Sequence, residues 1–322
     1  MAIREKALGP DHPELLFSYS GLGNVYRRVD REDESEQAFR EALRILAIGF
    51  PPGHPHEGIT RTNLAVTLRL LERWDESVAE YRAASVIQLG AGDPATAIAD
   101  SEAASFVLQI AGRCDEAVEQ GRHALALHDE HFPGSIIPRM SCYMTIAMAM
   151  VEGGRYSEAM PLLDEALSVR TAELGEDGAP VGVTRCWRGR ALGELGDLDT
   201  ARRELEQGRA IVKAAGYETH REYGMSAIAL GRVLLAQGDA ASAAELIDEI
   251  GPVDGVPDDI ADRAVAHGLA DAIDYHGIDR PPPQLGESGG PLVGNYIVLV
   301  ADENQGRRFH IRCQGRRVKR VL

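Results

Sequence analysis

The stretch Gly154-Arg155-Tyr156-Ser157-Glu158-Ala159-Met160-Pro161-Leu162-Leu163-Asp164-Glu165-Ala166-Leu167 decides the fold, because its pattern recurs five more times along the chain. When the copies are aligned on Ala159, the equivalent small residues are Ser35, Ser77, Ala117, Ala201 and Ala243. The steps between successive copies are 42, 40, 42, 42 and 42 residues. A fixed period of this length is typical of a solenoid built from repeated supersecondary units.

Residues at equivalent positions of the repeats also share their size. One column contains only small residues: Gly23, Ala65, Ser105, Ala147, Gly189 and Gly231. Three positions further on, a column contains only large apolar residues: Tyr26, Leu68, Leu108, Met150, Leu192 and Leu234. Small and large residues that alternate at helical spacing allow two helices to pack closely. Each repeat therefore predicts a pair of antiparallel helices.

Turn and capping residues place the ends of these helices. The pattern predicts first helices over roughly 13–29, 55–71, 94–111, 136–152, 180–195 and 220–237. Each ends at a residue that we expect to adopt a left-handed cap: Asp30, Glu72, Gly112, Gly154, Gly196 and Gly238. The second helices are predicted to start three residues later, at an N-cap column of Asp33, Asp75, Asp115, Ser157 and Asp199.

The columns resemble those of the tetratricopeptide repeat. In that repeat a small residue is followed by a large one three positions later and by further small residues twelve and nineteen positions later. The period of 42 residues, with the connector at residues 3–13, resembles the kinesin-light-chain variety. The resemblance covers residues 1–250, as six units preceded by the end of a second helix at residues 1–8. It implies an all-α fold: a right-handed superhelical solenoid of antiparallel helix pairs.

The C-terminal part departs from the repeats. Residues 251–276 predict a turn-rich break and one amphipathic helix, which would cap the stack. Residues 277–294 form a linker rich in Pro and Gly. Residues 295–322 are a basic tail, interpreted as a hairpin of strands at 296–300 and 309–313, as a disordered segment, or as read-through. These three interpretations stay open.

Composition narrows the functional classes. The formal net charge of −16 argues against a nucleic-acid partner. The four cysteines contain no CxxC pair, which favours a reduced, cytoplasmic location. The longest apolar run, Met144–Val151, is too short to span a membrane. Only three lysines accompany many arginines, which indicates a GC-rich bacterial genome.

Catalytic and metal-binding patterns are missing from the sequence. His123, His128 and His131, with the acidic pair Asp129 and Glu130, could suggest a metal site. They fall, however, at the end of a second helix and in its connector, where polar residues are ordinary. The sequence contains no phosphate-binding loop of the GxxxxGK[ST] type and no GxSxG elbow. We therefore expect no catalytic residue, no cofactor and no metal, and a protein that is not an enzyme.

The resemblance implies a binding groove instead. In tetratricopeptide arrays the first helices line the concave face, and the matching positions here are Asn24, Arg27, Arg28, Thr62, Val66, Arg69, Phe106, Gln109, Ile110, Met144, Met148 and Arg190. Arg27, Arg28 and Arg69 form a basic trio, and Phe106, Ile110, Met144 and Met148 form an apolar patch. These residue types favour a peptide that is acidic next to an apolar anchor.

Two functions follow from the resemblance. One is a non-catalytic scaffold that holds a peptide or helix of a partner protein in the groove. The other is the C-terminal regulatory region of a larger bacterial signalling enzyme, such as a serine/threonine kinase or a nucleotide-hydrolysing switch protein. The opening in the middle of a repeat further predicts exposed apolar residues near Leu22 and Tyr26, and self-association through this N-terminal end.

Overall fold

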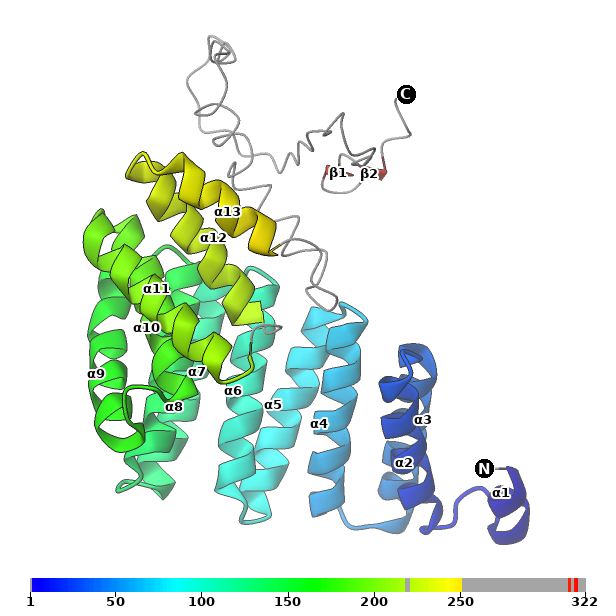
Figure 1. Cartoon of the computed structure of the whole chain (residues 1–322). Coiled ribbons are helices and arrows are strands. Elements are labelled where there is room, and N and C mark those ends of the chain that lie inside the picture. Colours follow the sequence, from blue (N-terminus) through cyan, green and yellow to red (C-terminus); the bar gives the residue numbers. More distant parts are fainter. Residues whose placement is uncertain (1, 218–220, 251–311, 314–315, 318–322) are drawn as a thin grey trace. The chain divides into compact units, whose positions relative to one another are not determined.

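The computed structural model describes residues 2–217, 221–250, 312–313 and 316–317 (Figure 1). The chain divides into two compact units, Met1–Val169 and Arg170–Leu322, and each is described by itself. The predicted helix at 251–276 and linker at 277–294 lie outside the described residues, as does the first predicted strand. In the tail, β1 (Arg312–Cys313) pairs antiparallel with β2 (Arg316–Arg317).

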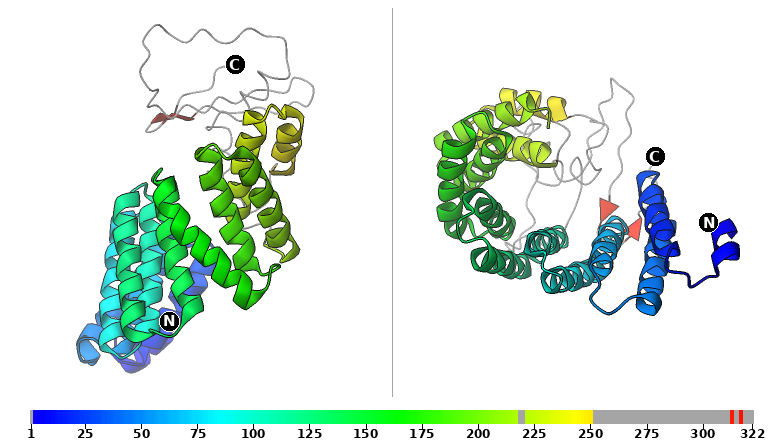
Figure 2. Two further views of the ribbon diagram at one scale, coloured as in Figure 1. Left: turned by 90° about the vertical axis from the view of Figure 1, so that its left-hand side faces the viewer. Right: turned by 90° about the horizontal axis from the view of Figure 1, so that it is seen from below.

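Unit 1 consists of helices that follow one another in antiparallel pairs. They are α1 (Ala2–Leu8), α2 (Leu15–Arg28), α3 (Glu32–Gly49), α4 (Pro55–Leu70), α5 (Trp74–Gly90), α6 (Pro94–Ile110), α7 (Cys114–His131), α8 (Ile136–Glu152) and most of α9 (Tyr156–Leu174). From α2 to α8, each helix packs against the next one in the chain, as Figure 2 shows. The first helices of neighbouring pairs also touch, α2 against α4 and α6 against α8.

Unit 2 continues the same pattern with α10 (Ala179–Glu194), α11 (Leu198–Ala214), α12 (Arg221–Ala236) and α13 (Ala240–Ile250). Here too each helix packs on its successor, and the first helices α10 and α12 touch. Each of the six predicted first helices is present, with ends within two residues of the prediction. The predicted all-α solenoid of helix pairs is confirmed.

The predicted left-handed caps are present at the ends of the first helices. Positive φ angles occur at Gly112, Gly154, Gly196 and Gly238, and also at Asp30 (53°) and Glu72 (58°), which are not glycines. The residue after each cap donates its N–H to the carbonyl of the large apolar column, for example Arg73 to Leu68 at 2.9 Å. This is the bonding of a Schellman motif, which satisfies carbonyls that the helix leaves free.

The predicted N-cap column is wrong by two residues. The second helices start directly after the Schellman turn, so that Asp33 and Asp75 lie at the second helical position. The cap residues are instead Arg31, Arg73 and Arg113, whose side chains cannot accept a hydrogen bond from the helix. The carboxylates of Asp33 and Asp75 still lie in the first turn of their helices, where the helix dipole favours negative charge.

The small column permits the close approach that the sequence predicts. A Cβ atom placed on Gly23 would lie 2.6 Å from the ring of Phe39, and one on Gly189 would lie 2.7 Å from Cγ of Leu205. Phe39 and Leu205 are completely buried. The first and second helices of a pair therefore touch where a side chain larger than hydrogen has no room.

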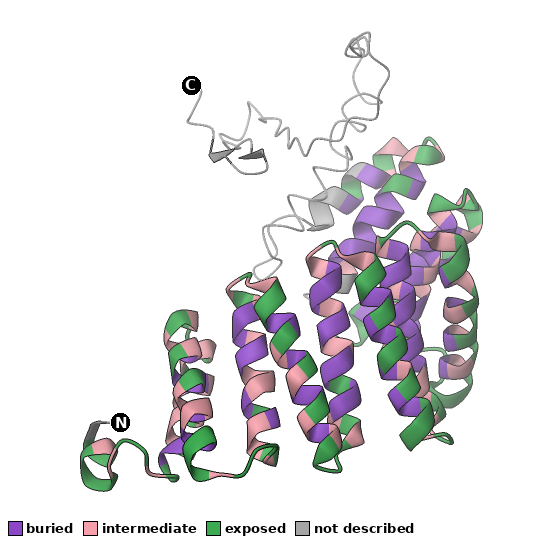
Figure 3. Ribbon diagram, turned by 180° about the vertical axis from the view of Figure 1, so that it is seen from behind, coloured by how far each residue is buried: buried purple, intermediate pink, exposed green. Residues whose placement is uncertain are grey.

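The N-terminal end of unit 1 exposes apolar residues on α2. Figure 3 colours each residue of the chain by its burial. Val25 is 56% exposed, whereas the equivalent residues of the next two repeats, Thr67 and Val107, are 0% exposed. Phe17 on the same helix and Val29 at its C-cap are also exposed, and Leu22 and Tyr26 are half-buried. The prediction of an incompletely covered first helix is therefore confirmed, while self-association through this end stays a prediction.

No helix in the described part of the chain is long and apolar enough to cross a membrane.

Candidate functional site: the first-helix face of unit 1

The first helices α2, α4, α6 and α8 place most of the predicted binding residues on one surface, here called the first-helix face. Arg28 is exposed, and the half-buried members are Asn24, Arg27, Thr62, Val66, Arg69, Phe106, Ile110 and Met148. Two members are buried: Gln109, and Met144 at 3% exposure. These two side chains pack inside the unit and contribute little surface to a partner.

Arg27, Arg28 and Arg69 lie close enough to influence one another. Arg27 donates to Oδ1 of Asn24 at 2.9 Å and to Oδ1 of Asn63 at 3.3 Å, which ties α2 to α4. Partial burial lowers the pKa of Arg27, and the positive charges of Arg28 and Arg69 lower it further. Burial raises the pKa of Tyr81, and the nearby positive charges of Arg69 and Arg27 oppose that rise. The two helices thus bring the predicted basic trio together.

None of these three arginines forms an ion pair with a described residue. Ten other arginines of unit 1 do form them: Arg4, Arg31, Arg40, Arg44, Arg61, Arg73, Arg113, Arg122, Arg139 and Arg155. The contrast shows that arginines are normally neutralised in this unit, and that the trio retains its positive charge.

The neutralised arginines include a periodic series at the starts of the second helices. Arg73 bonds Glu76 in its own repeat and Glu36 in the preceding one, both at 2.6 Å. Arg113 pairs in the same way with Glu116 and Asp75. Exposed ion pairs of this kind contribute little stability individually. They do connect consecutive repeats, and they neutralise the arginines of this series.

The predicted apolar patch is smaller than expected, because Met144 is buried. Phe106 and Ile110 lie one turn apart on α6, and Met148 on α8 occupies the position of Phe106 one repeat further on. Val66 extends the patch onto α4. With Met144 buried below, the accessible apolar surface is formed by these four half-buried side chains, next to the basic trio on α2 and α4.

A cavity of about 380 Å³ lies between α6, α7 and α8, and the sequence did not predict it. Its lining residues are Ala95, Ile98, Ala99, Glu102, His128, Phe132, Ser135, Pro138 and Ser141. Ala95, Ala99 and Pro138 are exposed, whereas Ile98 and His128 are buried, so the cavity is open at one side and closed at its base. Glu102 lies one helical turn from Phe106, which places the cavity beside the apolar patch.

The polar side chains that line this cavity are the carboxylate of Glu102, the imidazole of His128 and the hydroxyls of Ser135 and Ser141. Glu102 accepts a hydrogen bond from the hydroxyl of Thr145 at 3.4 Å. Burial raises the pKa of Glu102, and burial raises the pKa of the Cys142 thiol to about 12. His128 is 1% exposed, and its Nε2 has no hydrogen-bond partner among the described residues.

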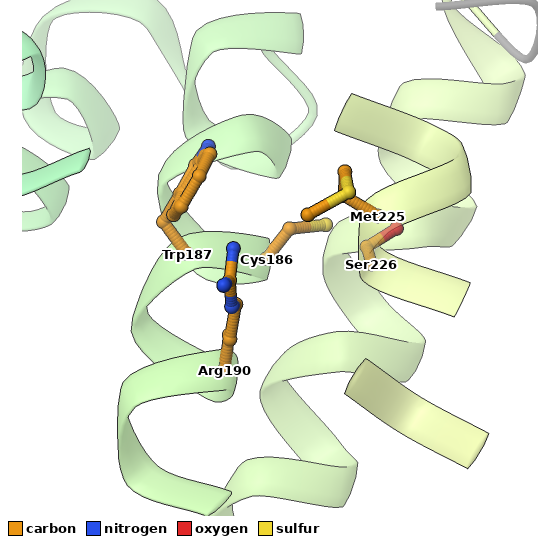
Figure 4. A pocket seen from close by; sticks show the side chains of 5 residues that line it. All are labelled: Cys186, Trp187, Arg190, Met225 and Ser226. Atoms are coloured by element: carbon orange, nitrogen blue, oxygen red, sulfur yellow. The ribbon is translucent and has the colours of Figure 1, made fainter. Parts of the chain in front are cut away.

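Arg190, the remaining predicted residue, belongs to unit 2. It is half-buried, and its guanidinium lies 5.2 Å from the ring centre of Trp187 on the same helix. Figure 4 shows both residues beside Cys186, with Met225 and Ser226 opposite on α12. The space between them, about 10 Å³, holds at most one water molecule. On its other side Arg190 lines a larger pocket of about 150 Å³ between α10 and α12, together with Glu194, Arg232 and Val233.

Within the described residues, no group of three or more His, Cys, Asp or Glu side chains is arranged to hold a metal ion.

Family comparisons agree with the geometry. Three family models described as tetratricopeptide repeat match residues 1–47, residues 139–178, and residues 182–207 together with 224–249. The chain is a tetratricopeptide repeat protein. Each match falls on helix pairs that the column pattern defines. No curated protein sequence matches this tetratricopeptide repeat chain.

Solved structures share its fold. The repeats of a putative kinesin light chain from Podosopora anserina superpose with a TM-score of 0.53 at 22% identity, covering 65% of this chain and 99% of that one. BtubC (BKLC) from P. vanneervenii gives 0.52 at 19% identity, over 85% of this chain and 96% of that one. NprR in complex with its cognate peptide NprX gives 0.58 at 14% identity, over 81% of this chain and 73% of that one. The repeats are therefore of the kinesin-light-chain-like type in fold.

Proposed function

We propose that this protein is a non-catalytic interaction scaffold that binds a peptide segment of a partner protein on the first-helix face of unit 1. The observation that carries the proposal is the unneutralised trio Arg27, Arg28 and Arg69, in a unit whose other arginines are mostly paired. The fold is compatible with this role, since NprR, which shares it, has been crystallised with a peptide. The alternative role, as the repeat region of a larger signalling enzyme, would use the same face.

The chemistry of the face specifies the peptide. Guanidinium groups bind carboxylates through paired, charge-assisted hydrogen bonds, so acidic residues are expected opposite the trio. Phe106, Ile110 and Met148 offer apolar contact to an aromatic or aliphatic anchor, and methionine adapts to its shape. The net charge of −16 repels acidic ligands at long range, so the affinity must come from the direct contacts that the peptide makes on the face. We expect affinity on the order of micromolar, about −8 kcal/mol.

Two substitutions separate the charged contribution from the apolar one. Peptides are first selected from a random library displayed against the full chain, and one is then titrated against variants at two salt concentrations. Arg69→Glu is expected to weaken binding at least tenfold and to flatten its salt dependence. The reason is that the guanidinium of Arg69 no longer neutralises a carboxylate of the peptide. Phe106→Ala is expected to weaken binding with the salt dependence retained.

The matched control is Arg122→Glu, which makes the same charge change on α7, at an exposed residue paired with Glu119. It is expected to leave the affinity of the selected peptide within twofold. If Arg122→Glu weakens binding as much as Arg69→Glu does, only net charge matters, and the first-helix face is not the binding surface.

A further inference from the structure

The cavity between α6, α7 and α8 combines features that a packing defect would not require. Its walls are apolar, formed by Ile98, Phe132 and Pro138. At its base lies a histidine that is 1% exposed and whose Nε2 has no described partner. An unpaired buried nitrogen costs free energy, because it has lost its bond to water without replacement. A ligand that bonds this atom would recover that loss.

The protonation of His128 indicates what kind of group would bind there. Its Nδ1 lies 3.5 Å from Oδ1 of Asp129, and a carboxylate can only accept. This neighbour favours the proton on Nδ1, which leaves Nε2 as an acceptor. The second polar group, Glu102, accepts as well. It already receives a hydrogen bond from Thr145, but a carboxylate has room for about four.

Two acceptors, beside two serine hydroxyls that can accept or donate and walls that are otherwise apolar, fit a ligand whose polar end only donates. Ammonium and guanidinium groups are the common groups of this kind, and both occur on flexible aliphatic stems. We propose that the cavity binds a lysine or arginine side chain of the bound peptide, with its stem along Ile98 and Phe132 and its charged end at Glu102 and His128. The proposal rests on the proposed function and adds a basic position to the acidic and apolar ones.

Two further observations support a cationic occupant. Burial raises the pKa of Glu102, which means that its negative charge lacks full compensation inside the protein. A cation in the cavity would supply that compensation. The exposed lining residue Ala99 lies two helical turns before Phe106 on α6, and Glu102 lies one turn before it. A peptide that contacts Phe106 can therefore place a neighbouring side chain in the cavity.

Two small probes test the proposal without knowledge of the partner. Nα-acetyl-lysine methylamide carries the ammonium on its stem, and Nα-acetyl-norleucine methylamide has a similar stem without the charge. Each is titrated into the full chain and followed through the imidazole NMR signals of His128. The lysine probe is expected to shift these signals with saturation, and the norleucine probe to bind at least tenfold more weakly. Equal binding of the two probes, or unchanged His128 signals with the lysine probe, would overturn the proposal.

Glu102→Gln provides a second, independent readout. The amide keeps the shape and an acceptor for Thr145 but removes the charge, so the variant is expected to fold and to bind the lysine probe about tenfold more weakly. Glu130→Gln is the control, because Glu130 is exposed on α7 and does not line the cavity. Glu130→Gln is expected to leave the affinity for the lysine probe unchanged. If both variants weaken the binding of the probe equally, the effect is one of general charge, and the proposed site is contradicted.

The outcomes for the cavity and for the face are distinguishable. If the lysine probe fails while Arg69→Glu weakens the selected peptide, the cavity proposal falls and the scaffold proposal stands. If the lysine probe binds at His128 but selected peptides ignore both Arg69 and Phe106, the cavity stands as a cation site and the peptide-binding proposal falls.

Discussion

Replacing Gly189 with leucine is expected to destabilise unit 2 by about 3 kcal/mol or more. A Cβ atom at this position would lie 2.7 Å from Cγ of Leu205 and 3.1 Å from the carbonyl oxygen of Ala201. The backbone atoms cannot move aside without separating α10 from α11, whose contact forms the core of the pair. The urea midpoint of the full chain, followed by circular dichroism, should fall accordingly.

Gly21→Ala is the control for this substitution. Gly21 lies inside α2, and a Cβ atom there would meet nothing within 4 Å. Because alanine favours a helix more than glycine does, this variant is expected to stabilise by about 0.5–1 kcal/mol. An unchanged midpoint for Gly189→Leu would mean that the small column does not mark close helix contacts.

Asp100→Asn is expected to stabilise unit 1 by up to about 3 kcal/mol above pH 7. Asp100 is 2% exposed; its Oδ1 accepts from Thr62 at 2.8 Å, and its Oδ2 has no described partner. Burial raises the pKa of Asp100 to about 6, from an ordinary value of 3.8. The folded state therefore holds this proton more tightly than the unfolded state does. The resulting stabilisation is present at acid pH and is lost as the pH rises from about 4 to 6.

Asparagine removes this pH dependence, because it keeps an acceptor for Thr62 and cannot ionise. Melting temperatures of the two proteins should nearly coincide at pH 4 and differ most at pH 7.5. Glu57→Gln, on a half-buried carboxylate that is paired with Arg61, should show no such gain at high pH. A variant that is less stable than the original protein at pH 7.5 would contradict this prediction, because the ionised carboxylate of Asp100 would then stabilise the folded state.

The sequence predicted the fold because the determinants of a repeat are local and recur. Gly23 and Gly189 stand in one column since each meets a large residue of its partner helix, and the caps at Asp30 and Glu72 follow the same turn as the glycine caps. The N-cap prediction failed for a physical reason. After the Schellman turn the next helix begins at once, so that Arg31 is its N-cap residue. The prediction chose Asp33 because aspartate is a common N-cap residue and arginine is not.

The candidate site was predicted only in part. The column positions brought Arg27 and Arg69 together in one set, and the two charges lie close enough to act on each other. They could not show that Met144 is buried, since burial depends on neighbours from other repeats. The cavity at His128 was missed for the same reason. His128 was weighed only as a metal ligand with its sequence neighbours, whereas its actual companion, Glu102, lies on another helix.

The most direct test of the binding face uses the methionine methyl groups as reporters in the full chain. Met148 lies on the first-helix face, and Met160 lies on the second helix α9 of the same unit. Both are half-buried, which makes them a matched pair. With methyl-labelled methionine, a peptide selected for binding is expected to shift the Met148 signal in proportion to saturation and to leave the Met160 signal unchanged. A shift at Met160 with none at Met148 would contradict the account, because the peptide would then occupy the opposite side of the repeats.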